Sequence, residues 1–131
     1  MMSIEDQTEL AARLYARVSE AIPLRMVEAR IGECKPEPQR CHANAVTWAE
    51  YNPGFKAVHG WLCADYRVLG KVAFIAHSVV EDQAGELLDI TPVHPVIRWR
   101  YPFLRDERPT ADYLRMIKEN GRVEVTHILR P

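Results

Sequence analysis

Three residues that together can perform nucleophilic catalysis occur in order along the chain: Cys41, His77 and Asp89. A thiolate is a nucleophile, an imidazole can exchange a proton with it, and a carboxylate can orient the imidazole. Cys41 lies in QRCHANAVTWAEYNPG, which indicates the start of a helix, whereas His77 and Asp89 lie in HSVVEDQAGELLDITP, which indicates a β-hairpin. The residue types and their elements therefore indicate cysteine catalysis.

Side-chain alternation places His77 and Asp89 on one face of the predicted hairpin. If the turn centres on Gln83, residue 89 lies directly opposite residue 77. If Gly85 is the left-handed residue of a three-residue loop, Thr91 lies opposite and Asp89 is the diagonal neighbour. Both registers keep the two backbone positions within roughly 5–8 Å, whereas a slip of one residue would separate the side chains. We expect the carboxylate to accept the Nδ1 proton and to leave Nε2 as the base.

Cys41 is predicted to lie in the first turn of its helix. Unpaired backbone amides and the helix dipole favour a thiolate there, and an imidazolium at His77 would lower the pKa of the thiol further. The backbone N–H of Cys41 is a candidate donor to an oxyanion. The nearby side-chain amides of Gln39 and Asn44 are candidates for the second donor.

A structural interpretation of the same residues stays open. Free cysteine is among the most buried residue types, and Cys41, Ala45 and Trp48 have the spacing of one inward helix stripe. His77 would then be a hydrogen-bonded core histidine and Asp89 a cap beside the turn. The order of the three residues and their elements favours catalysis over this alternative.

A zinc site is a competing interpretation, because thiols and imidazoles are the usual ligands of zinc. The candidate ligands are Cys34, Cys41 and His42, with Cys63 or His59. An adjacent Cys-His pair that follows another Cys after six residues matches no common spacing, so no metal is predicted.

Trp61 and the segment 97–103 each have a functional and a structural interpretation. Trp61, which follows His59 and Gly60, is a candidate pocket residue, with a core or edge position as the alternative. The run IRWRYPF at 97–103 combines aromatic and basic side chains that can contact nucleic acid. A formal net charge of -1 gives no broad attractive field, so a sheet edge or a wall beside the substrate is expected instead.

Length and composition predict one domain over residues 1–131. The chain is 47% hydrophobic and 27% charged, which is ordinary for a globular protein. Three cysteines without CxxC spacing favour a reduced, intracellular protein. The segment MMSIEDQTEL has no apolar signal core and no apolar run has the length of a membrane span, so a cytoplasmic protein without a membrane partner is expected.

The predicted elements give an α+β fold, with an antiparallel β-sheet packed against helices. A first helix with a capping-box-like start at Ser3 and Asp6 is ended by Pro23, and the segment 22–40 is a short strand or turn followed by a loop. The remaining expectations are a helix over 41–51, strands over 56–66 and 71–81 joined at Gly70, a strand in LLDIT, an irregular or edge strand in 92–109, a helix from a cap at Thr110 to Gly121, and a final strand in RVEVTHIL.

The segment around His77 and Asp89 also resembles a known family. HSVVEDQAGELLDITP is similar to the His-to-Asp segment of the transglutaminase-like branch of the papain-like cysteine enzymes, including its Asp-x-Thr-Pro ending. Cys41, followed about twenty residues later by VHGW, resembles the family's nucleophilic helix and the strand after it. The resemblance covers about residues 39–92 and implies a papain-like core, with Cys41 as nucleophile at a helix N-terminus, His77 as general base and Asp89 as orienter.

The expected function is a cysteine-dependent hydrolase or acyltransferase that acts on an amide, peptide or thioester through an acyl-enzyme. The substrate would be a small molecule or peptide, without a cofactor. His42 follows the cysteine where the family commonly has an aromatic residue, which favours hydrolysis over crosslinking. The alternative is a non-catalytic binding or interaction domain on the same fold with a relict triad. No oligomeric state is predicted.

Overall fold

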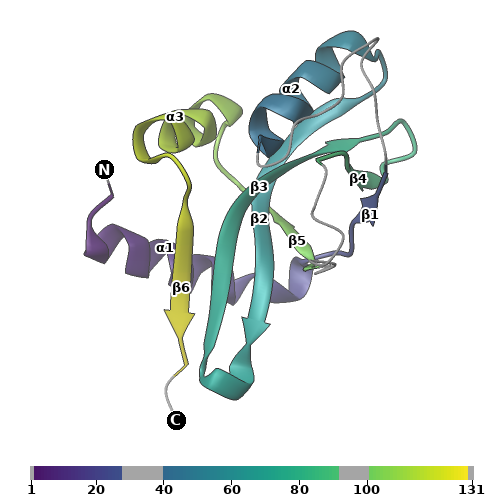
Figure 1. The fold of residues 1–131 in the computed structure, drawn as a ribbon. Coiled ribbons are helices and arrows are strands. Elements are labelled where there is room, and N and C mark those ends of the chain that lie inside the picture. Colours follow the sequence, from purple (N-terminus) through teal and green to yellow (C-terminus); the bar gives the residue numbers. More distant parts are fainter. Residues whose placement is uncertain (1, 28–39, 92–100, 130–131) are drawn as a thin grey trace. The chain divides into compact units, whose positions relative to one another are not determined.

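The structure is a computed structural model that describes residues 2–27, 40–91 and 101–129. It divides into two compact units. Unit 1 contains residues 1–22, 60–76 and 101–131, and unit 2 contains residues 23–59 and 77–100. Strands β2 (Lys56–Tyr66) and β3 (Lys71–Glu81) contribute residues to both units (Figure 1). The single domain over residues 1–131 stays a prediction.

Unit 1 is built on two amphipathic helices and the strands that they cover. The side chain of Ser3 accepts a hydrogen bond from the backbone N–H of Asp6, which caps the first helix as the sequence predicts. The helix over Thr110–Asn120 ends at Gly121, whose φ of 70° lies in the left-handed region. The elements are α1 (Ile4–Ala16), η1 (Val18–Glu20), η2 (Arg67–Leu69), β5 (Phe103–Arg105), α3 (Thr110–Asn120) and β6 (Glu124–Ile128).

The core of unit 1 is apolar. β6 pairs antiparallel with residues 71–75 of β3, and β5 pairs antiparallel with residues 60–62 of β2. α1 packs against β6. The buried members of this core are Leu10, Ala11, Leu14, Trp61, Cys63, Val72, Phe74, Ala76, Leu104, Tyr113, Met116, Val123 and Val125.

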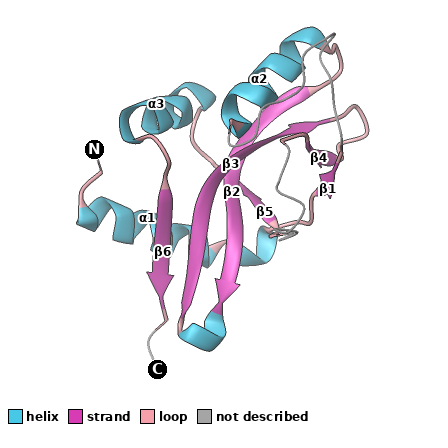
Figure 2. Cartoon of the chain, viewed as in Figure 1, coloured by secondary structure: helices cyan, strands magenta, loops and turns pink. Residues whose placement is uncertain are grey.

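Unit 2 contains one helix, α2 (Cys41–Tyr51), with the short strands β1 (Arg25–Met26) and β4 (Leu87–Asp89) and the remaining parts of β2 and β3. β4 pairs antiparallel with β3 and parallel with β1. Figure 2 shows these elements in magenta and cyan. The core of this unit consists of Ala45, Val80, Leu88 and Ile90, with Val27, Trp48, Phe55 and Ala57 packed against it.

The turn between β3 and β4 is a three-residue loop. Gly85 has a φ of 84°, and the backbone N–H of Asp82 donates to the carbonyl of Glu86 at 3.0 Å. Val80 is paired with Leu88, and continuing this register places Thr91 opposite residue 77, with Asp89 as its diagonal neighbour. This outcome confirms the second of the two predicted registers, in which a left-handed glycine closes the loop.

The predicted bounds of 41–51, 56–66 and 71–81 are confirmed. The sheet, however, is mixed rather than antiparallel, in the order β1-β4-β3-β2-β5 with β6 also paired to β3. β1 is two residues long, so side-chain alternation could not reveal its parallel pairing. α1 ends at Ala16 rather than near Pro23, because the chain tightens into η1. Thr110 is the first residue of α3, and Pro109 occupies the cap position.

Within the ranges 2–27, 40–91 and 101–129, none of the helices has the length and apolar character needed to cross a membrane.

Candidate active site

His77 and Asp89 form a buried hydrogen-bonded pair. His77 Nε2 lies 2.8 Å from Asp89 Oδ2, and the two side chains are 11% and 7% exposed. The other carboxylate oxygen of Asp89 accepts the backbone N–H of Thr91 at 3.1 Å. Both oxygens are thus engaged, and the carboxylate is held in one orientation toward the imidazole.

The nitrogen that meets Asp89 is the reverse of the expected one. The sequence argument assigned Nδ1 to the carboxylate and Nε2 to the thiol, whereas Nε2 bonds Asp89 in the structure. Asp89 is the diagonal neighbour of His77 and not the residue opposite it, so the carboxylate is reached by the far nitrogen of the ring. The nitrogen that remains for Cys41 is therefore Nδ1.

Cys41 is the first residue of α2, as predicted, and its side chain hydrogen-bonds both His42 and His77. Burial alone would raise the pKa of the thiol, because it penalises the thiolate. The hydrogen bonds and positive charge of the two histidines outweigh burial and lower the pKa of Cys41 to about 6. Cys41 consequently has the ionisation expected of a nucleophilic thiol.

The same contacts act on His77 in the opposite sense. Burial would lower the pKa of this imidazole, but the hydrogen bonds and charges of Asp89 and Cys41 raise it to about 10. Between about pH 6 and pH 10 the pair is therefore a thiolate beside an imidazolium. This charge distribution is the ground state from which a cysteine attacks a carbonyl carbon.

Asn44 lies one turn into the helix from Cys41 and is buried. Its side-chain Nδ2 donates to the hydroxyl of Thr91 at 3.0 Å. Because Thr91 also donates its backbone N–H to Asp89, this bond ties the first turn of α2 to the carboxylate segment. Asn44 was a candidate oxyanion donor; one N–H of its amide donates to Thr91, and the oxyanion role stays a prediction.

His42, which contacts the thiol, belongs to a cluster with Ser78 and His59 that the sequence did not predict. The Oγ atom of Ser78 is 2.6 Å from Nδ1 of His42 and 2.6 Å from Nδ1 of His59. The sequence placed the two histidines together only as possible zinc ligands, and strand alternation assigns residue 78 to the face opposite His77. Only the motif Cys-His after the loop, with a later His on the next strand, contained a signal for this cluster.

The remaining candidates are found in unit 1 or outside the described residues. Trp61, expected beside a pocket, is fully buried in the core of unit 1, and its indole N–H donates to Asp106 at 3.0 Å. The indole lies in the core position that was the alternative to a pocket role. Gln39, Cys34 and the basic run at 98–100 lie outside the described residues.

The cysteine of unit 1 differs sharply from Cys41. Cys63 is 2% exposed in an apolar core, and burial raises the pKa of its thiol to about 11. No metal-binding cluster of three His, Cys, Asp or Glu side chains occurs among the residues that the structure describes.

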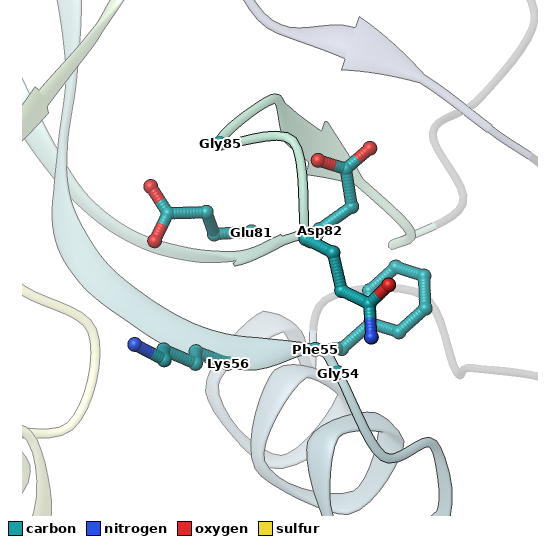
Figure 3. Close-up of a pocket in the computed structure, with 7 residues that line it drawn as sticks. Gly54, Phe55, Lys56, Glu81, Asp82 and Gly85 are labelled. Atoms are coloured by element: carbon teal, nitrogen blue, oxygen red, sulfur yellow. The ribbon is translucent and has the colours of Figure 1, made fainter.

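A separate hollow of unit 2 lies at the β3–β4 turn (Figure 3). It is lined by Gly54, Phe55, Lys56, Glu81, Asp82, Gln83 and Gly85, and by none of the three triad candidates. The side chains of Lys56 and Glu81 project to the same side of this hollow. Gln83 already fills the space beside Gly54, so this hollow is partly closed by its own loop.

The chain was compared with protein-family models, with curated proteins and with solved structures, and none of the three comparisons finds a match.

Proposed function

We propose that this chain is a cysteine-dependent hydrolase or acyltransferase that acts on an amide, peptide or thioester. The observation that supports the proposal is the continuous set of hydrogen bonds from the thiol of Cys41 to His77 and from His77 to Asp89. Each role in nucleophilic catalysis is matched by a group in contact with the next. The papain-like resemblance of residues 39–92 belongs to the same proposal.

In the proposed acylation step, the Cys41 thiolate attacks the substrate carbonyl carbon and an S–C bond forms. The carbonyl π electrons move to oxygen, and their return expels the amine or thiol of the substrate. His77 gives its proton to that leaving group. Asp89 accepts the opposite N–H of the ring throughout and keeps the imidazole in one orientation.

In the proposed deacylation step, neutral His77 takes a proton from water or an amine. The oxygen or nitrogen attacks the thioester carbonyl, the S–C bond breaks, and the thiolate and imidazolium are restored. The backbone N–H of Cys41 is the proposed oxyanion donor, because the first amides of a helix have no partner within the helix.

The first test is the pH dependence of iodoacetamide labelling, measured separately at each cysteine by mass spectrometry. Cys34→Ser removes the thiol outside the described residues. At pH 7, a thiol with a pKa of about 6 is about 90% thiolate, whereas one at 9.0 is about 1% thiolate. We expect the labelling rate at Cys41 to rise to a plateau with a midpoint near pH 6.

Cys63 is the control within the same sample, because its pKa of about 11 keeps it protonated up to about pH 9. A Cys41 profile with the midpoint of an ordinary thiol, at about pH 8.5, would refute the catalytic proposal. A relict triad in a binding domain would be the interpretation left in that case.

The second test is trapping of the acyl-enzyme. An activated acetyl ester is mixed with the protein in slight excess, and the reaction is quenched in acid. We expect one acetyl group on Cys41 and none in Cys41→Ser. His77→Gln should slow acetylation and also slow the loss of any acetyl group formed. Acetylation at Cys63 or at lysines alone would contradict the proposal.

A further inference from the structure

A second histidine, besides His77, contacts the proposed nucleophile. His42 is adjacent to Cys41 in the first turn of α2 and hydrogen-bonds its side chain. Its Nδ1 is held at 2.6 Å by the hydroxyl of Ser78, on β3. The thiol therefore has two imidazole partners, each with its own second contact.

The hydroxyl of Ser78 restricts the protonation of the two rings that it joins. Its Oγ lies 2.6 Å from Nδ1 of both His42 and His59, and Ser78 itself is 1% exposed. A hydroxyl has one proton, so it can donate to at most one of the two Nδ1 atoms and must accept an N–H from at least one of them. At least one of the two histidines is consequently protonated at Nδ1, and both rings are held by the same hydroxyl.

Burying polar side chains costs free energy unless each of them is hydrogen-bonded. His59 is 7% exposed on β2 and contacts Ser78, which in turn contacts His42 at the thiol. The ring centroids of His42 and His59 are 6.5 Å apart, so the hydroxyl bridges them. Cys41 is thus joined to two sets of contacts. One runs through His42 to Ser78 and His59, and the other through His77 to Asp89.

We propose that His42 is a second proton-exchanging partner of Cys41, and that Ser78 and His59 are the positioning residues that hold it. In this exchange the S–H bond of Cys41 breaks, an N–H bond forms on the His42 ring, and a thiolate beside an imidazolium results. The reverse transfer restores the thiol. The inference rests on the proposed function and deepens it by assigning the thiol two bases.

The titratable groups around the thiol define the experiment. His42 comes from α2 and His77 from β3. Asp89 on β4 contacts His77, and His59 on β2 is joined to His42 through the hydroxyl of Ser78. Glutamine at position 42 keeps a hydrogen-bonding amide but cannot take a proton. Alanine at position 78 removes only the bridging hydroxyl.

We expect His42→Gln to move the midpoint of Cys41 labelling upward by on the order of one pH unit, which lowers the labelling rate at pH 5 about tenfold. The rate at pH 9 should not change. Ser78→Ala should shift the midpoint in the same direction by less. Because Ser78 acts through His42, the double variant should match His42→Gln alone. In a His77→Gln background, adding His42→Gln should raise the midpoint further.

His127→Gln is the matched control, since this histidine belongs to unit 1 and stacks on Tyr15. It should leave the Cys41 profile unchanged, and urea unfolding of each variant identifies any loss of folding. If the wild-type midpoint of Cys41 labelling lies near pH 6 and His42→Gln does not change it, this inference is overturned and the proposed function is not. A wild-type midpoint near that of an ordinary thiol overturns this inference and the proposed function together.

Discussion

Replacing Asp89 by asparagine tests the geometry of the buried pair with the smallest change of shape. One oxygen of Asp89 accepts from His77 Nε2 at 2.8 Å and the other from the backbone N–H of Thr91 at 3.1 Å. An amide has one acceptor oxygen, so Asn can satisfy only one of these donors. If its NH₂ faces His77, the ring must release the Nε2 proton and hold one on Nδ1, the nitrogen that faces Cys41.

The size of the effect follows from the ionisation of His77. The rise of its pKa from 6.5 to about 10 corresponds to about 5 kcal/mol of folding free energy. Asp89 and Cys41 share this contribution, and removing the charge of one buried partner typically costs about 3–5 kcal/mol. We therefore expect Asp89→Asn to lower the free energy of unfolding by about 3 kcal/mol below pH 6.5.

The sign of the pH dependence is fixed by the raised pKa. A histidine whose pKa is raised on folding contributes its full stability below the unfolded value of 6.5 and loses it as the pH rises through about 10. The difference between wild type and Asp89→Asn should consequently be largest at pH 6 and narrow toward pH 10. What remains there is the neutral hydrogen bond, about 1 kcal/mol.

The assay is urea unfolding of both proteins at pH 6 and pH 10, in which all shared titrations cancel. Asp112→Asn makes the same chemical change in the exposed first turn of α3, where Asp112 and Arg115 are half-exposed. Its effect should stay below about 0.5 kcal/mol at either pH. An Asp89→Asn difference of equal size at both pH values would refute the charged pair. Acetylation of Cys41 should also slow by at least about 100-fold, because the wrong tautomer is favoured.

Substitutions at three further positions test the hairpin turn, the contact of Asn44 with Thr91 and a buried hydrogen bond of unit 1. Gly85→Ala should cost about 1–2 kcal/mol in urea unfolding, since φ at this position is 84°, and Gly85→Asn should cost less. Thr91→Val removes the acceptor of the Asn44 amide and should cost about 1–3 kcal/mol, with slower acetylation of Cys41. Tyr113→Phe removes a buried 2.7 Å bond to the carbonyl of Gly60 and should cost about 1 kcal/mol without altering the Cys41 labelling profile, whereas an altered profile would contradict it.

The elements that carry the candidate site could be predicted because local signals mark their ends. Asn52-Pro53-Gly54 ends the helix, and Gly70, with a φ of 76°, marks the turn between the two long strands. The left-handed Gly85 likewise selects one hairpin register, and that register brings Asp89 to His77. Side-chain parity over so short a hairpin leaves little freedom.

The contacts that depend on tertiary packing could not be predicted in the same way. Side-chain alternation gives the face on which a side chain lies, but not which ring nitrogen reaches a diagonal partner. The prediction therefore assigned Nδ1 of His77 to Asp89, whereas Nε2 makes that contact. The cluster of His42, Ser78 and His59 joins a helix and two strands through one hydroxyl. No periodic pattern relates these three positions, and their grouping follows only from how α2 packs.

The structural and catalytic interpretations of Cys41 prove to be compatible. Ala45 is fully buried in the core of unit 2 and Trp48 packs against it, so the inward helix stripe exists as the structural interpretation supposed. Cys41 lies one turn earlier on that same stripe, and its thiol contacts His42 and His77. Cys63 shows the other outcome, with a purely apolar surrounding and a raised pKa. Withdrawal from solvent therefore does not by itself decide whether the pKa of a cysteine is raised or lowered. The groups at the end of the stripe decide the chemistry, because the same desolvation that suppresses a lone thiolate strengthens one paired with an imidazolium.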